Sequence, residues 1–153
     1  MSIDPKLSQI IEEVAERFGK NHFSHHLGIE MILANNGRCI VRLPVKPGHL
    51  QNAGFVHGGI LATLADVAMG FAASSAVGED RHVLTGELKI SYLNPAIQPM
   101  MEARGTVLKA GRKIVFTEGE IWGCDSTGQA LTLVAKSSSS MVVVSKEDLK
   151  PKG

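Results

Sequence analysis

The chain has 153 residues, of which 44% are hydrophobic and 20% are charged, and its formal net charge is +1. This length fits one domain with a substantial core, and the composition excludes a largely disordered chain. The near-neutral charge argues against a global electrostatic attraction to nucleic acid or to an anionic membrane. We therefore expect one globular domain covering residues 1–153.

The N-terminal segment predicts an amphipathic helix over residues 5–18. Asp4 is a suitable N-cap and Pro5 a suitable first-turn residue, and apolar residues then recur at helical spacing. Gly19 is the expected stop. Acidic side chains at positions 4, 12 and 13 precede any long apolar run, so we do not expect a signal peptide.

Two short strands over residues 27–33 and 38–45 are predicted next, because an Asn-Asn-Gly turn at residues 35–37 separates them. Residues 57–77 predict the long helix of the protein. This helix is apolar on nearly every side, which is typical of a helix that is buried or crosses a membrane. Asp66 near its middle disfavours insertion into a bilayer, so we expect a buried central helix.

Four longer strands are predicted over residues 82–93, 100–109, 113–122 and 129–144, with turn-forming residues between them. Alternation is clearest in the first, where Leu84, Gly86, Leu88, Ile90 and Tyr92 share one face. Short connections between long strands favour an antiparallel meander. The pattern predicts an α+β fold in which one curved antiparallel sheet wraps the apolar helix.

Three further segments carry structural expectations. The serine run at residues 137–140 has apolar flanks, which favours an edge strand over a flexible linker. Residues 146–153 predict a disordered tail. Cys39 and Cys124 are too few for a disulfide framework, so we expect two free thiols in a cytoplasmic protein.

Asp66 is the candidate catalytic residue because it is the one ionisable side chain of the long helix after His57. An unpaired buried carboxylate is costly, so a carboxylate at this position suggests a general base or a nucleophile in a cleft. A partly exposed carboxylate that bonds a neighbouring backbone group is the structural alternative.

Gly58 and Gly59 open the same helix. Free N–H groups at a helix start, together with the positive end of the helix dipole, suit an oxyanion or a polarised carbonyl. Asp66 lies eight residues beyond Gly58, a rise of about 12 Å. That gap is long for one small reacting group held by a single chain.

These residues carry a family resemblance. Gln51, the His-Gly-Gly of residues 57–59 and the Leu-Ala-Asp of residues 64–66 resemble the acyl-CoA thioesterases of the hotdog superfamily, in the branch of the phenylacetate-pathway (PaaI-like) thioesterase. Residues 90–96 and 108–113 are similar as well, and the match runs from about residue 27 to about residue 143. The resemblance implies a long helix wrapped by an antiparallel sheet.

The resemblance also implies roles. Asp66 would activate water or attack the thioester, and the Gly58 N–H would polarise its carbonyl. Gln51 would hold water or the carbonyl, with Asn52 as the alternative register, and Thr85 would supply a hydroxyl.

His57 belongs to the implied motif, and either a catalytic role or a role in holding the loop remains open. Sites of the family are built from two chains, which implies a homodimer with shared active sites and a dimer of dimers. Such an arrangement would bring Gly58 and Gln51 of one chain near Asp66 of another.

Two polar clusters have open interpretations. Gly111, Arg112 and Lys113, with Lys109, lie at a predicted turn and are either solvated or bind the phosphates of coenzyme A. The histidines at positions 22, 25 and 26 lack a carboxylate or cysteine to complete a metal site, so we expect no metal.

The sequence therefore predicts a cofactor-independent acyl-CoA thioesterase that releases a free acid and coenzyme A. One alternative is a hotdog-fold dehydratase acting on hydroxyacyl thioesters, with His57 as its base. The other is a non-catalytic acyl-CoA sensor, which would not need a carboxylate at Asp66.

Overall fold

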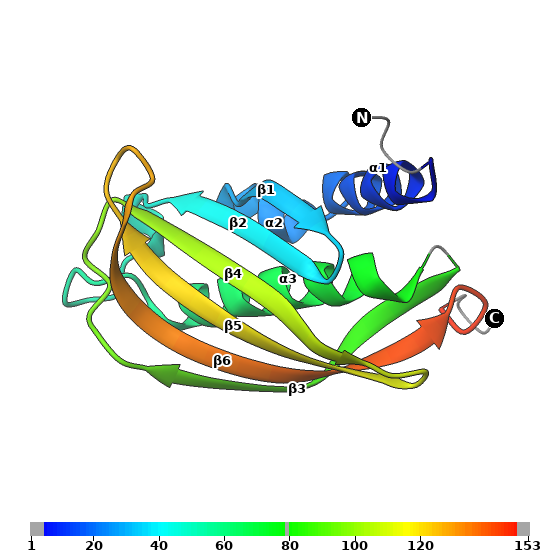
Figure 1. The fold of residues 1–153 in the computed structure, drawn as a ribbon. Helices are drawn as coiled ribbons and strands as arrows, with labels where there is room; N and C mark the ends of the chain where they lie inside the picture. Colours follow the sequence, from blue (N-terminus) through cyan, green and yellow to red (C-terminus); the bar gives the residue numbers. More distant parts are fainter. Residues whose placement is uncertain (1–4, 79, 150–153) are drawn as a thin grey trace.

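The structure, a computed structural model, describes residues 5–78 and 80–149 and confirms the α+β fold (Figure 1). In this part of the chain the helices are α1 (Pro5–Gly19), α2 (His22–Leu27), the 3-10 helix η1 (Pro47–His49) and α3 (Gly58–Val77). The strands are β1 (Glu30–Asn35), β2 (Arg38–Pro44), β3 (Arg81–Tyr92), β4 (Met100–Ala110), β5 (Ile114–Cys124) and β6 (Ala130–Ser145).

The central helix α3 lies in the curve of the sheet and contacts all six strands (Figure 1). Its buried side chains come from successive turns and from several sides of the helix: Leu61, Leu64, Ala65, Val67, Ala68, Met69, Ala72, Ala73 and Ser75. Among the described helices, α3 alone is long and apolar enough to cross a bilayer. Its position inside the sheet explains this composition, because a helix surrounded by strands must be apolar on most sides.

One contact shows how closely the sheet wraps the helix. Gly105 on β4 lies so near the backbone of Ala68 that an added Cβ would overlap it. Glycine at this position therefore allows the middle of β4 to reach α3.

The strand order differs from a simple meander. The sheet formed by the described residues has the order β1-β2-β4-β5-β6-β3, and all neighbouring strands are antiparallel. The predicted meander is right for β4, β5 and β6 and wrong for β3, which pairs with β6. The physical reason is that β2 occupies the other side of β4, with Arg42 opposite Glu102, so β3 closes against the far side of the sheet.

The serine run is therefore not at an edge. Ser138 on β6 lies opposite Glu118 of β5 and Lys89 of β3, so the prediction of an edge strand for residues 137–140 is wrong. The two edges of the described sheet are β1 and β3, and the second side of β3 pairs with no strand of the described chain. An unpaired edge strand is a site for association with another chain.

The N-terminal region contains a helix that the sequence analysis missed. Residues 22–27 form α2, so the first strand begins at Glu30 and not at residue 27. The side chain of Asn21 caps α2 by accepting a hydrogen bond from the Ser24 N–H at 3.1 Å, and Gly28 ends it with φ 82°. The predicted Asn-Gly hairpin turn is confirmed, with Asn36 at φ 46° and Gly37 at φ 75°.

The beginning of the predicted disordered tail is ordered. Residues 146–149 form a turn in which the Ser145 hydroxyl donates to Asp148 at 2.7 Å, and the Lys146 ammonium contacts Glu13 at 3.0 Å. Residues 150–153 lie outside the described residues. Cys39 and Cys124 are free thiols in the structure, and both are buried. Burial raises the pKa of the Cys39 thiol to about 12.

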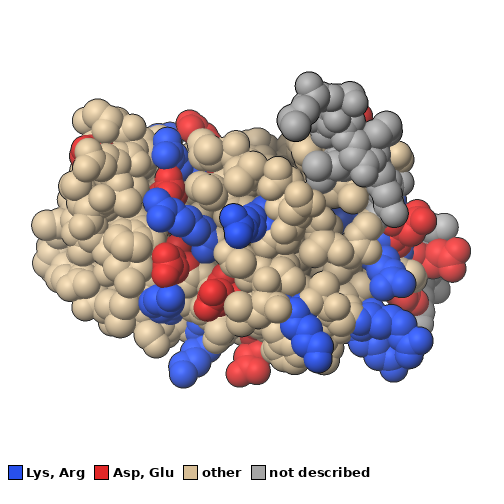
Figure 2. Space-filling view, viewed as in Figure 1, with Lys and Arg blue, Asp and Glu red and all other residues tan. Residues whose placement is uncertain are grey.

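A network of charged and polar side chains crosses the strands on the face seen in Figure 2. The buried Glu102 accepts hydrogen bonds from Arg42 and Arg104, each at 2.7 Å. Arg104 also lies over the ring of Trp122, whose indole N–H donates to Glu120. These contacts connect β2, β4 and β5 and satisfy the one carboxylate in the network that is removed from solvent.

Candidate active site

Asp66 lies near the middle of α3 and is half-buried. The hydroxyl of Thr85 on β3 donates a hydrogen bond to its Oδ1 at 2.6 Å and also approaches Met141 Sδ at 3.5 Å. A carboxylate held by a hydroxyl donor beside apolar side chains is suited to accept a proton or to attack an electrophile. The structure thus brings together two of the predicted site residues within one chain.

Thr85 reaches Asp66 because of an irregularity in β3. The pairing of β3 with β6 shifts between Thr85 and Glu87, which marks a β-bulge at Gly86. The predicted continuous alternation is therefore wrong before this point: Leu84 is 50% exposed, whereas Thr85 faces Met141 and the helix. A bulge commonly re-aims a neighbouring side chain in this way.

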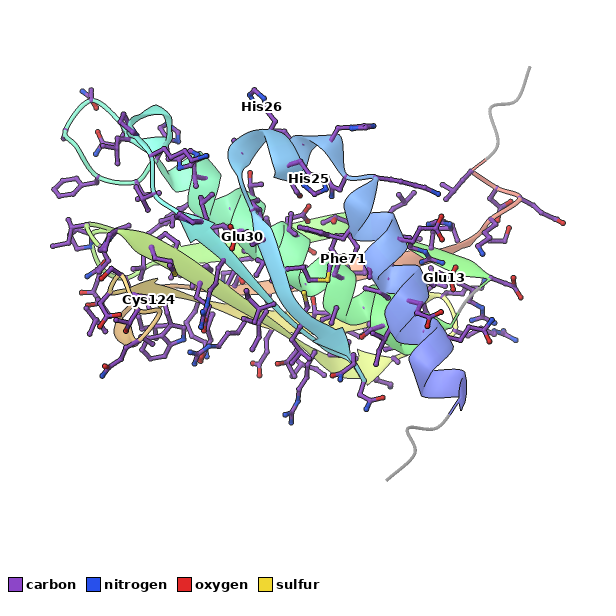
Figure 3. The ribbon with its side chains drawn as sticks, turned by 90° about the horizontal axis from the view of Figure 1, so that it is seen from above. Glu13, His25, His26, Glu30, Phe71 and Cys124 are labelled. Carbon is purple, nitrogen blue, oxygen red and sulfur yellow. The ribbon has the colours of Figure 1, made fainter. Side chains whose placement is uncertain are left out.

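A cavity of about 410 Å³ opens beside Asp66. Its walls come from four parts of the chain: Gly70, Phe71 and Ser74 on α3, Val83 and Thr85 on β3, Met141 on β6, and Arg17 and Lys20 near the end of α1. Figure 3 shows Phe71 beneath the region where α1 meets α2, and its ring lies edge-on to Phe18 at 5.4 Å. The N-terminal helix therefore closes one side of the cavity that holds the carboxylate.

Gln51 and Gly58 line a second cavity, also of about 410 Å³. Tyr92 belongs to the same cavity, and its hydroxyl donates to the Gly58 carbonyl at 2.9 Å. The two cavities share no lining residue. Within one chain, the structure therefore does not bring Asp66 together with Gly58 or Gln51.

The Gly58 N–H is positioned as a hydrogen-bond donor at the start of α3. His57 is the N-cap of this helix, and its Nδ1 accepts a hydrogen bond from the Gly59 N–H at 2.9 Å. Gly59 therefore uses its N–H inside the loop. The N–H of Gly58 has no hydrogen-bond partner among the described residues, so it is available to an oxygen atom of a ligand.

His57 and Gln51 both make contacts that shape the loop before α3. The N–H of His57 donates to the His49 carbonyl at 2.8 Å, and Gln51 Oε1 accepts from the Ala53 N–H at 2.6 Å. Asn52 is exposed in the turn and lines neither cavity. The geometry gives His57 a role in holding the loop, which was one of its two predicted roles.

The turn formed by Gly111, Arg112 and Lys113, called the basic turn below, belongs to neither cavity in this chain. Gly111 closes the turn between β4 and β5 by donating its N–H to the Ile114 carbonyl at 2.9 Å, and Arg112 and Lys113 are exposed. None of the three lines either cavity. Their predicted role in binding the substrate stays a prediction.

Sequence reasoning missed two residues that face the cavities. Tyr92 entered only as part of a strand, and its bond to Gly58 could not be inferred without the fold. His82 lines the Asp66 cavity, and burial together with the positive charges of Arg17 and Lys146 holds its pKa below the usual value. The neighbouring Glu13 acts in the opposite direction.

The histidines of α2 do not converge. His25 packs edge-on against Phe18 at 5.4 Å, and its Nε2 lies 3.1 Å from the Phe18 carbonyl oxygen. Figure 3 shows His26 pointing away from this contact. No group of three or more His, Cys, Asp or Glu side chains in residues 5–78 and 80–149 is arranged to hold a metal ion.

Comparison with known sequences identifies related proteins. Residues 53–128 match the family model described as "Thioesterase superfamily". A protein of Saccharolobus solfataricus named "Putative esterase" is 30% identical over 116 residues, which cover 75% of this chain and 82% of that protein.

Solved structures show the same fold. A thioesterase family protein from Silicibacter pomeroyi is 27% identical, with a TM-score of 0.84, and the match covers 89% of this chain and 98% of that chain. The PaaI protein from the phenylacetic acid degradation operon of E. coli has a TM-score of 0.78 at 20% identity, covering 91% and 96%. A Streptococcus mutans protein bound to acetyl CoA has a TM-score of 0.66 at 25% identity, covering 78% and 90%.

Proposed function

This chain belongs to the thioesterase superfamily, and we propose that it hydrolyses acyl-coenzyme A thioesters to a free acid and coenzyme A. The observation that carries this proposal is the carboxylate of Asp66, which is oriented by the Thr85 hydroxyl beside a largely apolar cavity. The similarity to a protein bound to acetyl CoA supports a coenzyme A thioester as the substrate class.

In the proposed reaction, Asp66 acts on the thioester carbonyl carbon in one of two ways. As a general base, it removes a proton from water while the water oxygen bonds to the carbonyl carbon. As a nucleophile, it forms an anhydride that water then hydrolyses. In both routes the carbon–sulfur bond breaks. In the first, Asp66 passes the proton taken from water to the leaving sulfur. In the second, the sulfur leaves as a thiolate and takes its proton from solvent. The Thr85 hydroxyl holds Asp66 Oδ1 in a fixed orientation.

The Gly58 N–H stabilises the negative charge that develops on the carbonyl oxygen. Backbone N–H groups at a helix start are fixed before the reaction and need little reorganisation, which makes them effective donors to an oxyanion. Gln51 lines the same cavity and is placed to hold the carbonyl or a water molecule.

Two chains build each site in this proposal. Asp66 and Gly58 face separate cavities in one chain, and β3 has an unpaired edge among the described residues. Pairing of β3 with the same strand of a second copy gives a two-fold dimer with a continuous sheet. Gly58 of one copy then lies close to Asp66 of the other. A further pairing of dimers into a tetramer is also proposed.

The basic turn is the proposed contact for the phosphates of coenzyme A. Arg112 and Lys113 are exposed at the tip between β4 and β5, with Lys109 close by in sequence. Arginine and lysine side chains bind phosphate oxygens by charge-assisted hydrogen bonds.

The direct test is thiol release from a panel of alkyl and aryl acyl-CoAs, with the second product identified by mass. Free acid together with coenzyme A supports the proposal. An enoyl thioester formed from a hydroxyacyl substrate would instead show a dehydratase. Binding without turnover, at an affinity that Asp66→Asn leaves unchanged, would show a sensor.

A further inference from the structure

Gly70 lies in the interior of α3, where neither the backbone conformation nor packing within the chain requires a glycine. It lies one helical turn after Asp66 and lines the same cavity. Apart from the adjacent residues and the nearby backbone of α3 itself, a Cβ added at this position would meet no atom of the described chain within 4 Å. Gly70 therefore differs from Gly105, where an added Cβ would overlap the backbone of Ala68.

The backbone gives no reason for glycine at this position. Gly70 is not among the described glycines with positive φ, and it lies inside a regular helix. Glycine in a helix interior lowers stability relative to alanine because it has more conformational freedom to lose on folding. An open space on its side-chain side means that packing within the chain does not require the glycine either.

The cavity next to Gly70 has an apolar part that suits an acyl group, and polar side chains such as Arg17 and His82 line the rest of it. Val67, Phe71, Val83 and Met141 provide apolar walls, and Phe71 is held in place by its edge-on contact with Phe18. Along α3, the residues at positions 66, 70 and 74 are one turn apart, so they follow each other along one side of the cavity. The distance from the first to the last is about 12 Å of helix rise.

We propose that Gly70 is a specificity-determining residue. Its missing side chain leaves room next to Asp66 for acyl groups larger than acetyl, whether these are alkyl or aryl. This inference rests on the proposed thioesterase function. A side chain at position 70 would enter the cavity where the acyl carbons beyond the thioester carbonyl would lie. The small acetyl group does not reach this space.

The test compares kcat/KM for acetyl-CoA, octanoyl-CoA and phenylacetyl-CoA in the wild type, Gly70→Ala and Gly70→Leu. We expect the wild type to prefer the two larger substrates. Gly70→Leu should lower their kcat/KM relative to acetyl-CoA by about tenfold or more, because apolar pockets discriminate by roughly this factor per methylene. Gly70→Ala should shift the ratio in the same direction by less.

Ala76→Leu is the matched control, since it adds a leucine to an exposed position of α3 outside both cavities. Its substrate ratio should equal that of the wild type. Circular dichroism and size-exclusion chromatography show whether each variant is folded and assembled. If Gly70→Leu fails to assemble, Gly70→Ala decides the question.

The outcomes separate the two proposals. No thiol release by the wild type from any of the three substrates would overturn the thioesterase function and, with it, the role of Gly70. Hydrolysis with a preference for acetyl-CoA, or a folded Gly70→Leu with an unchanged substrate ratio, would overturn the role of Gly70 alone. An equal loss on all three substrates in Gly70→Ala would assign the glycine to chain packing and also overturn it.

Discussion

The hydroxyl of Thr85 donates a 2.6 Å hydrogen bond to Oδ1 of Asp66, and this bond connects the edge strand β3 to the central helix α3. The bulge at Gly86 makes the contact possible, because it turns Thr85 toward the helix while Leu84 remains half exposed. The candidate nucleophile or base is thus oriented by the strand that is also free to pair with a second chain.

Replacing Thr85 by valine removes this donor and keeps a side chain of similar shape. Hydrogen bonds to charged groups contribute about 1.5–3 kcal/mol, so we expect Thr85→Val to lower kcat by roughly 10- to 100-fold. KM should change little, since Thr85 orients Asp66 in our proposal and does not bind the acyl group. Thr85→Ser, which restores a hydroxyl, should recover most of the rate. Steady-state kinetics of both variants measure this, and a Thr85→Val enzyme with wild-type kcat would remove the contact from the mechanism.

Asp66→Asn should keep the fold and lose turnover. The substitution is nearly isosteric and removes a charge from a largely apolar neighbourhood, so the free energy of unfolding should stay constant or rise. Loss of a general base commonly lowers the rate by about 10²- to 10⁴-fold. Urea unfolding and thiol release on the same preparation provide the measurement, and near wild-type hydrolysis would exclude Asp66 as the base.

Local patterns of apolar and turn-forming residues in the sequence predicted most of the fold. The apolar surface of residues 57–77 predicted a wrapped helix, and the Asn-Gly turn predicted the first hairpin. The pairing of β3 with β6 was not predictable in this way, because it depends on which strand occupies the far side of β4. Short connections favoured β4 as the partner, whereas β2 already pairs there.

The residues of the candidate site could be predicted from the sequence where they belong to the recognised motif. Asp66 and Gly58 follow from the spacing of the motif, and the structure leaves their assignment as a prediction. The sequence did not reveal that Thr85 points toward Asp66, since Leu84, Gly86 and Leu88 look like one continuous apolar face. The one-residue shift at Gly86 is a property of strand pairing, and the sequence of a single strand does not reveal it.

His57 provides a test of a structural role against a catalytic one. Its Nδ1 caps α3 by accepting the Gly59 N–H, so His57→Ala should lower the free energy of unfolding by about 1 kcal/mol. His57→Asn can form an equivalent cap and should keep both stability and turnover. Chemical unfolding and kcat for the two variants separate the roles. A stable His57→Asn enzyme without activity would support a catalytic imidazole instead.

His82 predicts a pH dependence of stability. Burial and the positive charges of Arg17 and Lys146 hold its pKa in the folded protein below the ordinary value of 6.5. Between the folded-state pKa and pH 6.5 the unfolded chain therefore binds more protons at His82 than the folded chain. The contribution of His82 to stability is fully present above pH 6.5 and is lost as the pH falls through the folded-state pKa.

The measurement is the urea midpoint at about pH 7.5 and about pH 5, on either side of the histidine titration range. The decrease between the two conditions should be smaller in His82→Gln, which cannot be protonated. Other groups titrate in both proteins, so the difference between the two decreases isolates His82. Equal decreases would contradict the depressed pKa.

The central claim is that one active site uses Asp66 of one chain and Gly58 of another. Gly58→Pro removes the N–H while proline suits the first position of a helix. Gly58→Ala is its control, because it keeps the N–H and places the same Cβ at 3.3 Å from the Tyr92 ring. Asp66→Asn and Gly58→Pro should each be inactive alone, and Gly58→Ala should retain activity.

Mixing Asp66→Asn subunits with Gly58→Pro subunits tests this claim directly. Half of the randomly formed dimers are mixed, and each mixed dimer contains one site with both lesions and one site with neither. The mixture should therefore recover about a quarter of wild-type activity after subunit exchange. No recovery from folded subunits that have demonstrably exchanged would show that the site lies within one chain, and would contradict the shared site.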